Sequence, residues 1–187
     1  MNSISCLILS LFVGIQCCGD FYWREFEGVI PTDAISFGYS DFVQKQLYIG
    51  QAYIHNYGLM IGKIYNGAKQ ITVPCYGTKT TNTAIKILCA QDSRKYYWLS
   101  TTNETYSTDT ANKCPVLGGY DETIPDHTNL THGVLHIGRI NYLDDYVTGN
   151  IAAYHEYPLF YYVLNNVEKN SAVYEVLMYS DNPIQTP

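Results

Sequence analysis

Few residues of this sequence have the types and spacing that catalysis or metal binding requires. His132 and His136 lie four positions apart, but residues 134–137 alternate as in a strand, where four positions span about 13 Å. That separation is too large for two ligands of one metal ion. The sequence also lacks the G-x-S-x-G and H-E-x-x-H motifs of hydrolases and metalloproteases. We therefore expect neither an enzyme nor a metal centre, and no cofactor.

Carboxylates are the remaining candidates for acid–base chemistry. A glycosidase needs two of them about 5–9.5 Å apart, and the sequence does not establish such a distance. Asp144 and Asp145 are adjacent, which is typical of a solvated turn. Glu175 falls within a strand pattern, so we expect it to be a cross-strand partner.

The cysteines fall into an N-terminal group and a group in the body of the chain, namely Cys6, Cys17 and Cys18, and Cys75, Cys89 and Cys114. No C-x-x-C or C-x-H spacing occurs, so a structural zinc site is not supported. A bridge between Cys75 and Cys89 would remove about 3 kcal/mol of unfolded-state entropy. The spacing leaves the pairing open.

The N-terminus has the features of a secretory leader. The first nineteen residues carry no Asp, Glu, Lys or Arg, and residues 4–15 are apolar but too few to cross about 30 Å of hydrocarbon. Residues 1–19 are therefore predicted to be a signal peptide. Cleavage before Asp20 leaves three cysteines, whereas cleavage after Cys17 leaves four. No second apolar run has the length of an anchor, so we expect no membrane insertion.

Composition and sequons agree with an extracellular protein that does not bind nucleic acid. The 187 residues include 11 Lys and Arg against 17 Asp and Glu, and no basic run is present to neutralise phosphates. The 19 tyrosines favour a β-rich protein whose exterior suits protein contacts, such as a homodimer. N-glycosylation sequons occur at Asn103 and Asn129, as expected for a secreted chain.

Two parts of the chain echo each other, which indicates an internal repeat. Residues 23–88 are similar in order to residues 98–177, and both contain Leu-x-Ile-Gly, at 47–50 and at 135–138. Insertions lengthen the second copy, and both sequons fall within them, as expected for exposed loops. We expect residues 20–90 to form the first repeat and residues 91–187 the second, with loop insertions.

The period within each copy is two, which predicts an all-β protein of antiparallel hairpins and meanders. The matched glycines at 50 and 138, and at 62 and 149, sit inside strand patterns, where a bulge or a close backbone approach is expected. Each copy has roughly 65–80 residues, a size at which a separate core is marginal. We therefore expect the two copies to share strands in one compact unit.

An ordered series of motifs resembles the tandem DM9 repeat family. It comprises residues 27–34, 38–39, 47–50, 62–63, 74–77 and 174–177, and the resemblance extends from Phe21 to Tyr179. The resemblance implies an all-β protein in which two repeats form one compact antiparallel unit with interleaved strands. Some members are lectins that recognise mannose-type glycans and microbial surfaces, a function in innate immunity.

In those lectins the sugar is bound by an Asp after a Gly-rich turn and by the Lys of a Pro-Gly-Lys motif. The matching positions are Asp41 and Lys63 in the first copy, and Asp121 and Asn150 in the second, where Asn replaces the Lys. A carboxylate accepts hydrogen bonds from adjacent sugar hydroxyls, and an ammonium donates to their oxygens. We expect Asp41 and Lys63 to converge on one shallow polar pocket, with a weaker second site at Asp121.

These observations favour a secreted, non-enzymatic protein that binds mannose-type glycans or glycoproteins. The ring of Tyr39 or Tyr65 is a candidate to pack against the C–H face of the sugar. The alternative is a structural or protein-interaction component of an extracellular secretion or coat, with a decayed sugar site. Replacement of the lysine at Asn150 favours this alternative, whereas the retained pair in the first copy favours sugar binding.

Overall fold

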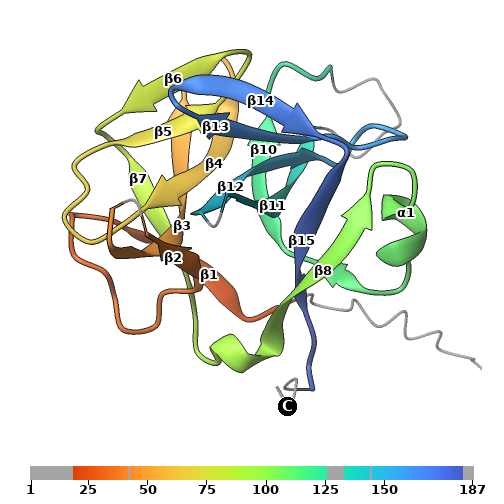
Figure 1. Cartoon of the computed structure of the whole chain (residues 1–187), viewed down its shortest axis with the longest axis horizontal. Helices are drawn as coiled ribbons and strands as arrows, with labels where there is room; N and C mark the ends of the chain where they lie inside the picture. The colour runs from red at the N-terminus through yellow and green to blue at the C-terminus, as the bar shows by residue number, and fades with distance from the viewer. Residues whose placement is uncertain (1–18, 42, 126–132, 144, 183–187) are drawn as a thin grey trace, which may run out of the picture.

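The computed structural model describes residues 19–41, 43–125, 133–143 and 145–182, and these form a β structure (Figure 1). The first half contains strands β1 to β7, at Phe21–Glu25, Ser36–Ser40, Lys45–Ile54, Gly58–Ile64, Ile71–Pro74, Thr78–Thr81 and Ile85–Ala90. The second half contains β8 to β15, at Tyr96–Thr102, Cys114–Pro115, Leu117–Asp121, Val134–Tyr142, Asp145–Ala152, Phe160–Leu164, Val167–Ser171 and Val173–Tyr179. A 3-10 turn at Ser93–Lys95 precedes β8, and the short helix α1 at Tyr106–Asp109 follows it. The prediction of an antiparallel all-β fold is confirmed.

The pairing order of the strands is the same in the two halves. In the first, β3 pairs with β2, β4 and β7, and β7 pairs with β1. In the second, β11 pairs with β10, β12 and β15, and β15 pairs with β8. Pairing of β4 with β10 joins the halves into one sheet of thirteen of the described strands. The halves are therefore one continuous structure.

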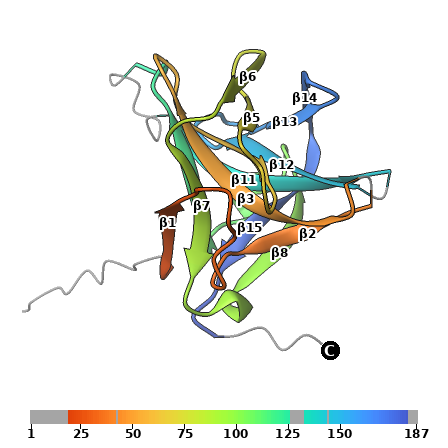
Figure 2. The ribbon, with the colours of Figure 1, turned by 90° about the vertical axis from the view of Figure 1, so that its left-hand side faces the viewer.

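Two hairpins, β5–β6 and β13–β14, complete the halves and lie together at the top of Figure 1. In the second view (Figure 2), both hairpins again lie at the upper end of the molecule, with β5–β6 to the left of β13–β14. The Thr78 hydroxyl donates a hydrogen bond of 3.2 Å to the Asn166 carbonyl, which links the two hairpins. This arrangement brings the turn of each hairpin next to a strand of the other half.

Glycine pairs lie where β4 and β12 meet these hairpins closely. Gly50 is opposite Gly62, and Gly138 is opposite Gly149. A Cβ atom on Gly62 would lie 2.6 Å from the Thr72 carbonyl oxygen, and one on Gly149 would lie 2.1 Å from that of Tyr161. The expected close backbone approach is therefore present in both halves.

The alternation predicted from Leu-x-Ile-Gly defines the core. Leu47, Ile49, Leu135 and Ile137 are all buried, whereas the residues between them are half-buried. Apolar side chains of both halves pack into the same main cluster. This shared burial is a large favourable contribution to folding, because it scales with the apolar area removed from water.

The structure excludes the Cys75–Cys89 bridge, one of the pairings that the sequence left open. Cys75 and Cys89 are both free and buried, so the Cys75–Cys89 bridge is not formed. Cys114 is disulfide-bonded. Burial raises the pKa of the Cys75 thiol to about 11 and that of Cys89 to about 12, so both stay protonated near neutral pH.

The structure bears in part on the predictions of a signal peptide, of glycosylation sites and of no membrane insertion. Residues 1–18 of the predicted signal peptide, and Asn129, lie outside the described residues. Asn103 lies in the turn after β8, where its N–H donates a hydrogen bond of 2.8 Å to the Ala172 carbonyl. Among the described residues, no helix has the length and apolarity needed to span a membrane.

Candidate functional site

Lys63 lies on β4 with a half-exposed side chain that points away from the core, between the buried residues Gly62 and Ile64. Its Nζ is 4.0 Å from Oδ2 of Asp145, the first residue of β12. This distance is within the range of an ion pair but beyond that of a hydrogen bond. Both groups therefore keep hydrogen-bonding capacity for a third molecule.

The structure does not bring Asp41 and Lys63 together, in contrast to the predicted convergence. Asp41 lies in the exposed turn after β2, where its carbonyl oxygen accepts a hydrogen bond of 2.7 Å from the Gln44 side chain. Ser40 pairs with Lys45 on one edge of β3, and Lys63 pairs with Ile49 on the other. Four positions along β3 correspond to about 13 Å. Asp145 is the acid that Lys63 meets.

Lys63 and Asp145 line a surface pocket of about 490 Å³, here called the Lys63 pocket. Its walls come from the β4–β5 region of the first half, and from the β11–β12 hairpin and the β13–β14 turn of the second. Tyr65, Thr72 and Asn166 add an aromatic ring, a hydroxyl and an amide. The volume is within the usual range for small-molecule sites.

Leu143 lies at the rim of this pocket, near the tip of the β11–β12 hairpin. It is 85% exposed and has a φ of 51°, which is uncommon for a residue other than glycine. Tyr142 pairs with Asp145 across this turn, and two-residue hairpin turns require positive φ values, so the turn explains the conformation of Leu143. Its exposed side chain adds apolar surface at the rim of the pocket.

A second site, here called the Asp121 cavity, contains the two predicted residues of the second copy. Asp121, the last residue of β10, and Asn150 of β12 both line this cavity of about 180 Å³. Residues 74–76 of the first half close it from the other side, and Tyr161 and Glu168 line it from β13 and β14. The structure therefore brings Asp121 and Asn150 to one cavity between the halves.

Asp121 is buried and accepts hydrogen bonds at both carboxylate oxygens. The Tyr76 and Tyr154 hydroxyls donate to Oδ2 over 2.8 and 3.0 Å, and the N–H and hydroxyl of Thr123 donate to Oδ1 over 2.9 and 2.7 Å. All these donors are neutral. They hold the carboxylate in place, and among the described residues it forms no ion pair.

Asn150 has a structural function at this cavity. Its Oδ1 accepts a hydrogen bond of 2.8 Å from the Ile61 N–H, and its Nδ2 donates to the Pro74 carbonyl over 3.0 Å and to the Met60 sulfur over 3.4 Å. The amide joins β12 to two segments of the first half. Its position after Gly149 matches that of Lys63 after Gly62.

Glu168, which the sequence did not single out, places a second carboxylate at the Asp121 cavity. Desolvation raises its pKa above the ordinary value, while backbone N–H groups of Gly77 and Cys75 lower it in part. Burial, and the nearby Glu168 charge, also raise the pKa of Tyr161. No sequence motif marks these residues, because they meet Asp121 only across the fold.

The other candidates have structural partners. Glu175 lies opposite Arg139, whose Nε donates to it over 2.7 Å, so the prediction of a cross-strand partner is confirmed. His136 shares a hydrogen bond with the buried hydroxyl of Tyr106. His132 lies outside the described residues. Within the described ranges, no group of three or more His, Cys, Asp or Glu side chains is placed to hold a metal ion.

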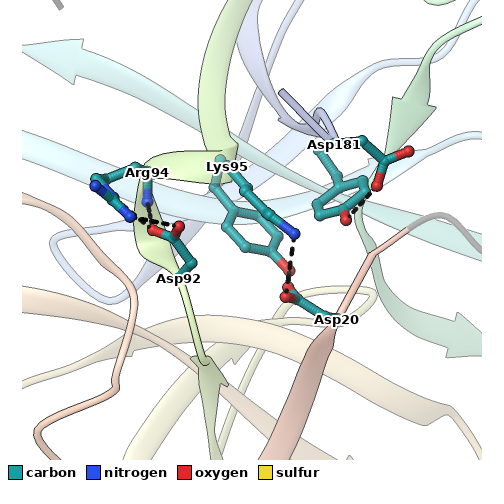
Figure 3. Close-up of polar contacts among 7 residues, drawn as sticks. Asp20, Asp92, Arg94, Lys95 and Asp181 are labelled. Carbon is teal, nitrogen blue, oxygen red and sulfur yellow. Dashed lines mark hydrogen bonds and ion pairs between the residues drawn. The ribbon is translucent and has the colours of Figure 1, made fainter. Parts of the chain in front are cut away.

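A third polar cluster lies on the surface where β1 begins (Figure 3). The Lys95 ammonium points at the Asp20 carboxylate over 3.7 Å, and Asp20 also accepts a hydrogen bond of 2.8 Å from the Tyr96 hydroxyl. To one side, Arg94 pairs with Asp92 over 2.8 Å. These groups satisfy one another at the surface, so the cluster is an attachment of the first strand to the second half rather than a binding site.

A comparison of the chain with protein-family models finds no match, and one with curated protein sequences finds none either. The DM9 resemblance therefore remains an expectation carried by the motifs quoted above.

Proposed function

We propose that this protein is a non-enzymatic carbohydrate-binding protein and that the Lys63 pocket takes one sugar unit of a mannose-type glycan. The observation that carries the proposal is the 4.0 Å separation between Lys63 Nζ and Asp145 Oδ2 in a pocket shared by both halves. A sugar hydroxyl accepts a hydrogen bond from the ammonium through its oxygen and donates a hydrogen bond to the carboxylate. One hydroxyl group thus satisfies both charged groups without separating them.

The remaining lining suits a polyhydroxylated ligand. Thr72 and Asn166 have side chains that both donate and accept hydrogen bonds, as sugar hydroxyls do. Tyr65 and Tyr142 supply aromatic surface for the C–H groups of a pyranose ring. Tyr65 is one of the two tyrosines that the sequence suggested for this purpose, whereas Tyr39 does not line the pocket.

The family resemblance supports the same ligand class, with one change of residue. Lys63 keeps the expected cationic position, but Asp145 replaces Asp41 as the acid. We also propose that the protein is secreted. The apolar leader of residues 1–19 supports this location, and so does the disulfide at Cys114, since disulfides persist in oxidising compartments.

A protein-contact function is the second candidate, and exposed apolar side chains favour it. Val29, Leu143 and Val173 are 75%, 85% and 67% exposed. They lie in different parts of the chain, and single exposed apolar residues are normal on protein surfaces. Of the three, Leu143 borders the Lys63 pocket, so the sugar-binding proposal accounts for the residue with the greatest exposure.

Calorimetric titration with methyl α-mannoside, and with a mannose-type oligosaccharide, tests the proposal. Lys63→Met and Asp145→Asn each remove a charge-assisted hydrogen bond worth about 1.5–3 kcal/mol, so binding should weaken roughly ten- to a hundredfold. Lys86→Met is a matched control, because Lys86 has the same 39% side-chain exposure and pairs with an acid at 3.8 Å outside the pocket.

Asp41→Asn distinguishes the observed site from the one that the family pattern predicts. We expect it to bind like the wild type, since Asp41 does not line the pocket. Absence of binding by the wild type would refute the function. Binding that depends on Asp41 but not on Asp145 would return the site to the turn after β2.

A further inference from the structure

The Asp121 cavity has a different chemistry from the Lys63 pocket. Its lining includes two carboxylates, those of Asp121 and Glu168, and no Lys or Arg among the described residues. Neither carboxylate forms an ion pair within the described part of the chain. Lys79 lies close by on β6, but its ammonium is placed over the Tyr57 ring, 5.4 Å from the centroid. The cavity therefore gathers two carboxylates that pair with no Lys or Arg of the described residues, and His155 also lines it.

Aromatic surface surrounds the same space. Tyr76 and Tyr154 come from different halves, and their hydroxyls converge on one oxygen of Asp121. Tyr161 adds a third ring, next to Glu168 in the β13–β14 hairpin. The faces of tyrosine rings carry partial negative charge and attract cations within about 6 Å of their centres. The rings and the carboxylates therefore both favour a cationic ligand.

We propose that the Asp121 cavity is a binding site for a compact organic ammonium ion, which pairs with Asp121 and Glu168 and packs against the tyrosine rings. Burying charged groups is costly unless they are paired, so a cation that enters the cavity relieves a cost that the free protein bears. The cavity volume of about 180 Å³ limits the ligand to monosaccharide size or less. An amino sugar and a small methylated amine both carry the required group.

The cavity is organised before any ligand arrives. Asp121 is fixed by four hydrogen bonds, and Asn150 ties the wall formed by Pro74 to β12. Pre-organisation of this kind lowers the entropic cost of binding. Lys63 and Asp145 do not line this cavity, so ammonium binding here does not depend on the proposed glycan function.

Pairs of ligands that differ in charge but little in shape test the inference on the unmodified protein. Calorimetric titration compares choline with 3,3-dimethylbutan-1-ol, its neutral isostere, and glucosamine with glucose. We expect at least one ammonium ligand to bind at least about tenfold more tightly than its neutral counterpart. Preference for choline identifies a methylated amine as the ligand type, and preference for glucosamine identifies an amino sugar. Equal binding within both pairs, or no binding of either ammonium ligand, would overturn the inference.

Charge-neutral variants then place the ligand. Glu168→Gln should weaken ammonium binding by about tenfold or more. Glu122→Gln is the control, because Glu122 is an exposed acid next to Asp121 in the chain that does not line the cavity. An unchanged affinity in Glu168→Gln, or an equal loss in Glu122→Gln, would show that the cation binds elsewhere and would refute the assigned site. Methyl α-mannoside binding should be unaffected in both variants.

Discussion

At the scale of single residues, His136 links burial to the pH dependence of stability. Desolvation lowers its pKa from an ordinary value near 6.5 to about 4. Between these two values the unfolded chain binds more protons than the folded one. The stability that neutral His136 provides is therefore complete above about pH 6.5 and is lost as the pH falls toward 4.

Replacing His136 with Gln should make the acid limb, the fall in stability between pH 6.5 and pH 4, less steep. Urea unfolding measured from pH 7 to pH 4 should show a shallower fall in the free energy of unfolding, by up to about 1.4 kcal/mol per pH unit for one proton. His55→Gln is the control, because His55 is exposed in the β3–β4 turn. An acid limb equally steep in His136→Gln and in the wild type would show that other groups determine it.

Asn150 is a second residue whose effect follows from its buried hydrogen bonds. Asn150→Leu removes the acceptor of the Ile61 N–H and the donor to the Pro74 carbonyl. Each buried group left unpaired costs about 1–3 kcal/mol, so the free energy of unfolding should fall by at least that amount. Asn82→Leu, at an exposed position, is the control for denaturant unfolding. Equal stability of the two variants would contradict the structural function of Asn150.

The sequence predicted Lys63, Asp121 and Asn150 as residues of interest, and all three line a cavity. It did not predict Asp145 or Glu168 as site residues, because their positions depend on how distant hairpins pack. Asp145 was assigned to a solvated turn from its neighbour Asp144. The structure instead places Asp145 at the start of β12, and a local pattern cannot show that this strand end meets β4 of the other half.

At the scale of the elements, a substitution at Gly149 tests the close approach of β13 to β12. Gly149→Ala places a Cβ atom 2.1 Å from the Tyr161 carbonyl oxygen, which β13 can relieve only by moving away. Overpacking of this kind costs about 1–3 kcal/mol or more. Gly67→Ala is a useful comparison, because its φ of +84° imposes backbone strain while no atom lies within 4 Å. Thermal unfolding should show a larger loss of stability for Gly149→Ala than for Gly67→Ala, and the reverse order would contradict the close packing.

Strand positions were predictable because alternation and glycine placement are local properties of the chain. The buried Leu47, Ile49, Leu135 and Ile137 were all expected from period two. The pairing of β4 with β10, and the absence of a Cys75–Cys89 bridge, were not predictable. Both depend on which elements become neighbours, and spacing along the chain does not determine that.

At the scale of the whole molecule, reciprocal contacts join the halves. The side chains that follow Leu-x-Ile-Gly, Gln51 and Arg139, each donate a hydrogen bond of 2.6 Å to a carbonyl of the other half, at Gly118 and Phe37. The Arg139 guanidinium also lies between two rings, 4.3 Å from the centroid of Trp98 and 4.7 Å from that of Tyr146. Such matched contacts support the interpretation of two similar repeats that interlock.

The interlocking predicts that neither half folds alone. In residues 20–90 expressed separately, β4 would lose its pairing with β10, and the fully buried Ile61 would lose the packing against Gly118. A fragment of this size has little core to offset the loss, so we expect an unfolded or aggregating product without a cooperative melt. Addition of residues 91–187 as a second chain should restore a folded complex, because the missing contacts are non-covalent. A soluble 20–90 fragment that melts sharply by itself would show instead that the first half is an independent domain and that the cavities between the halves form by docking.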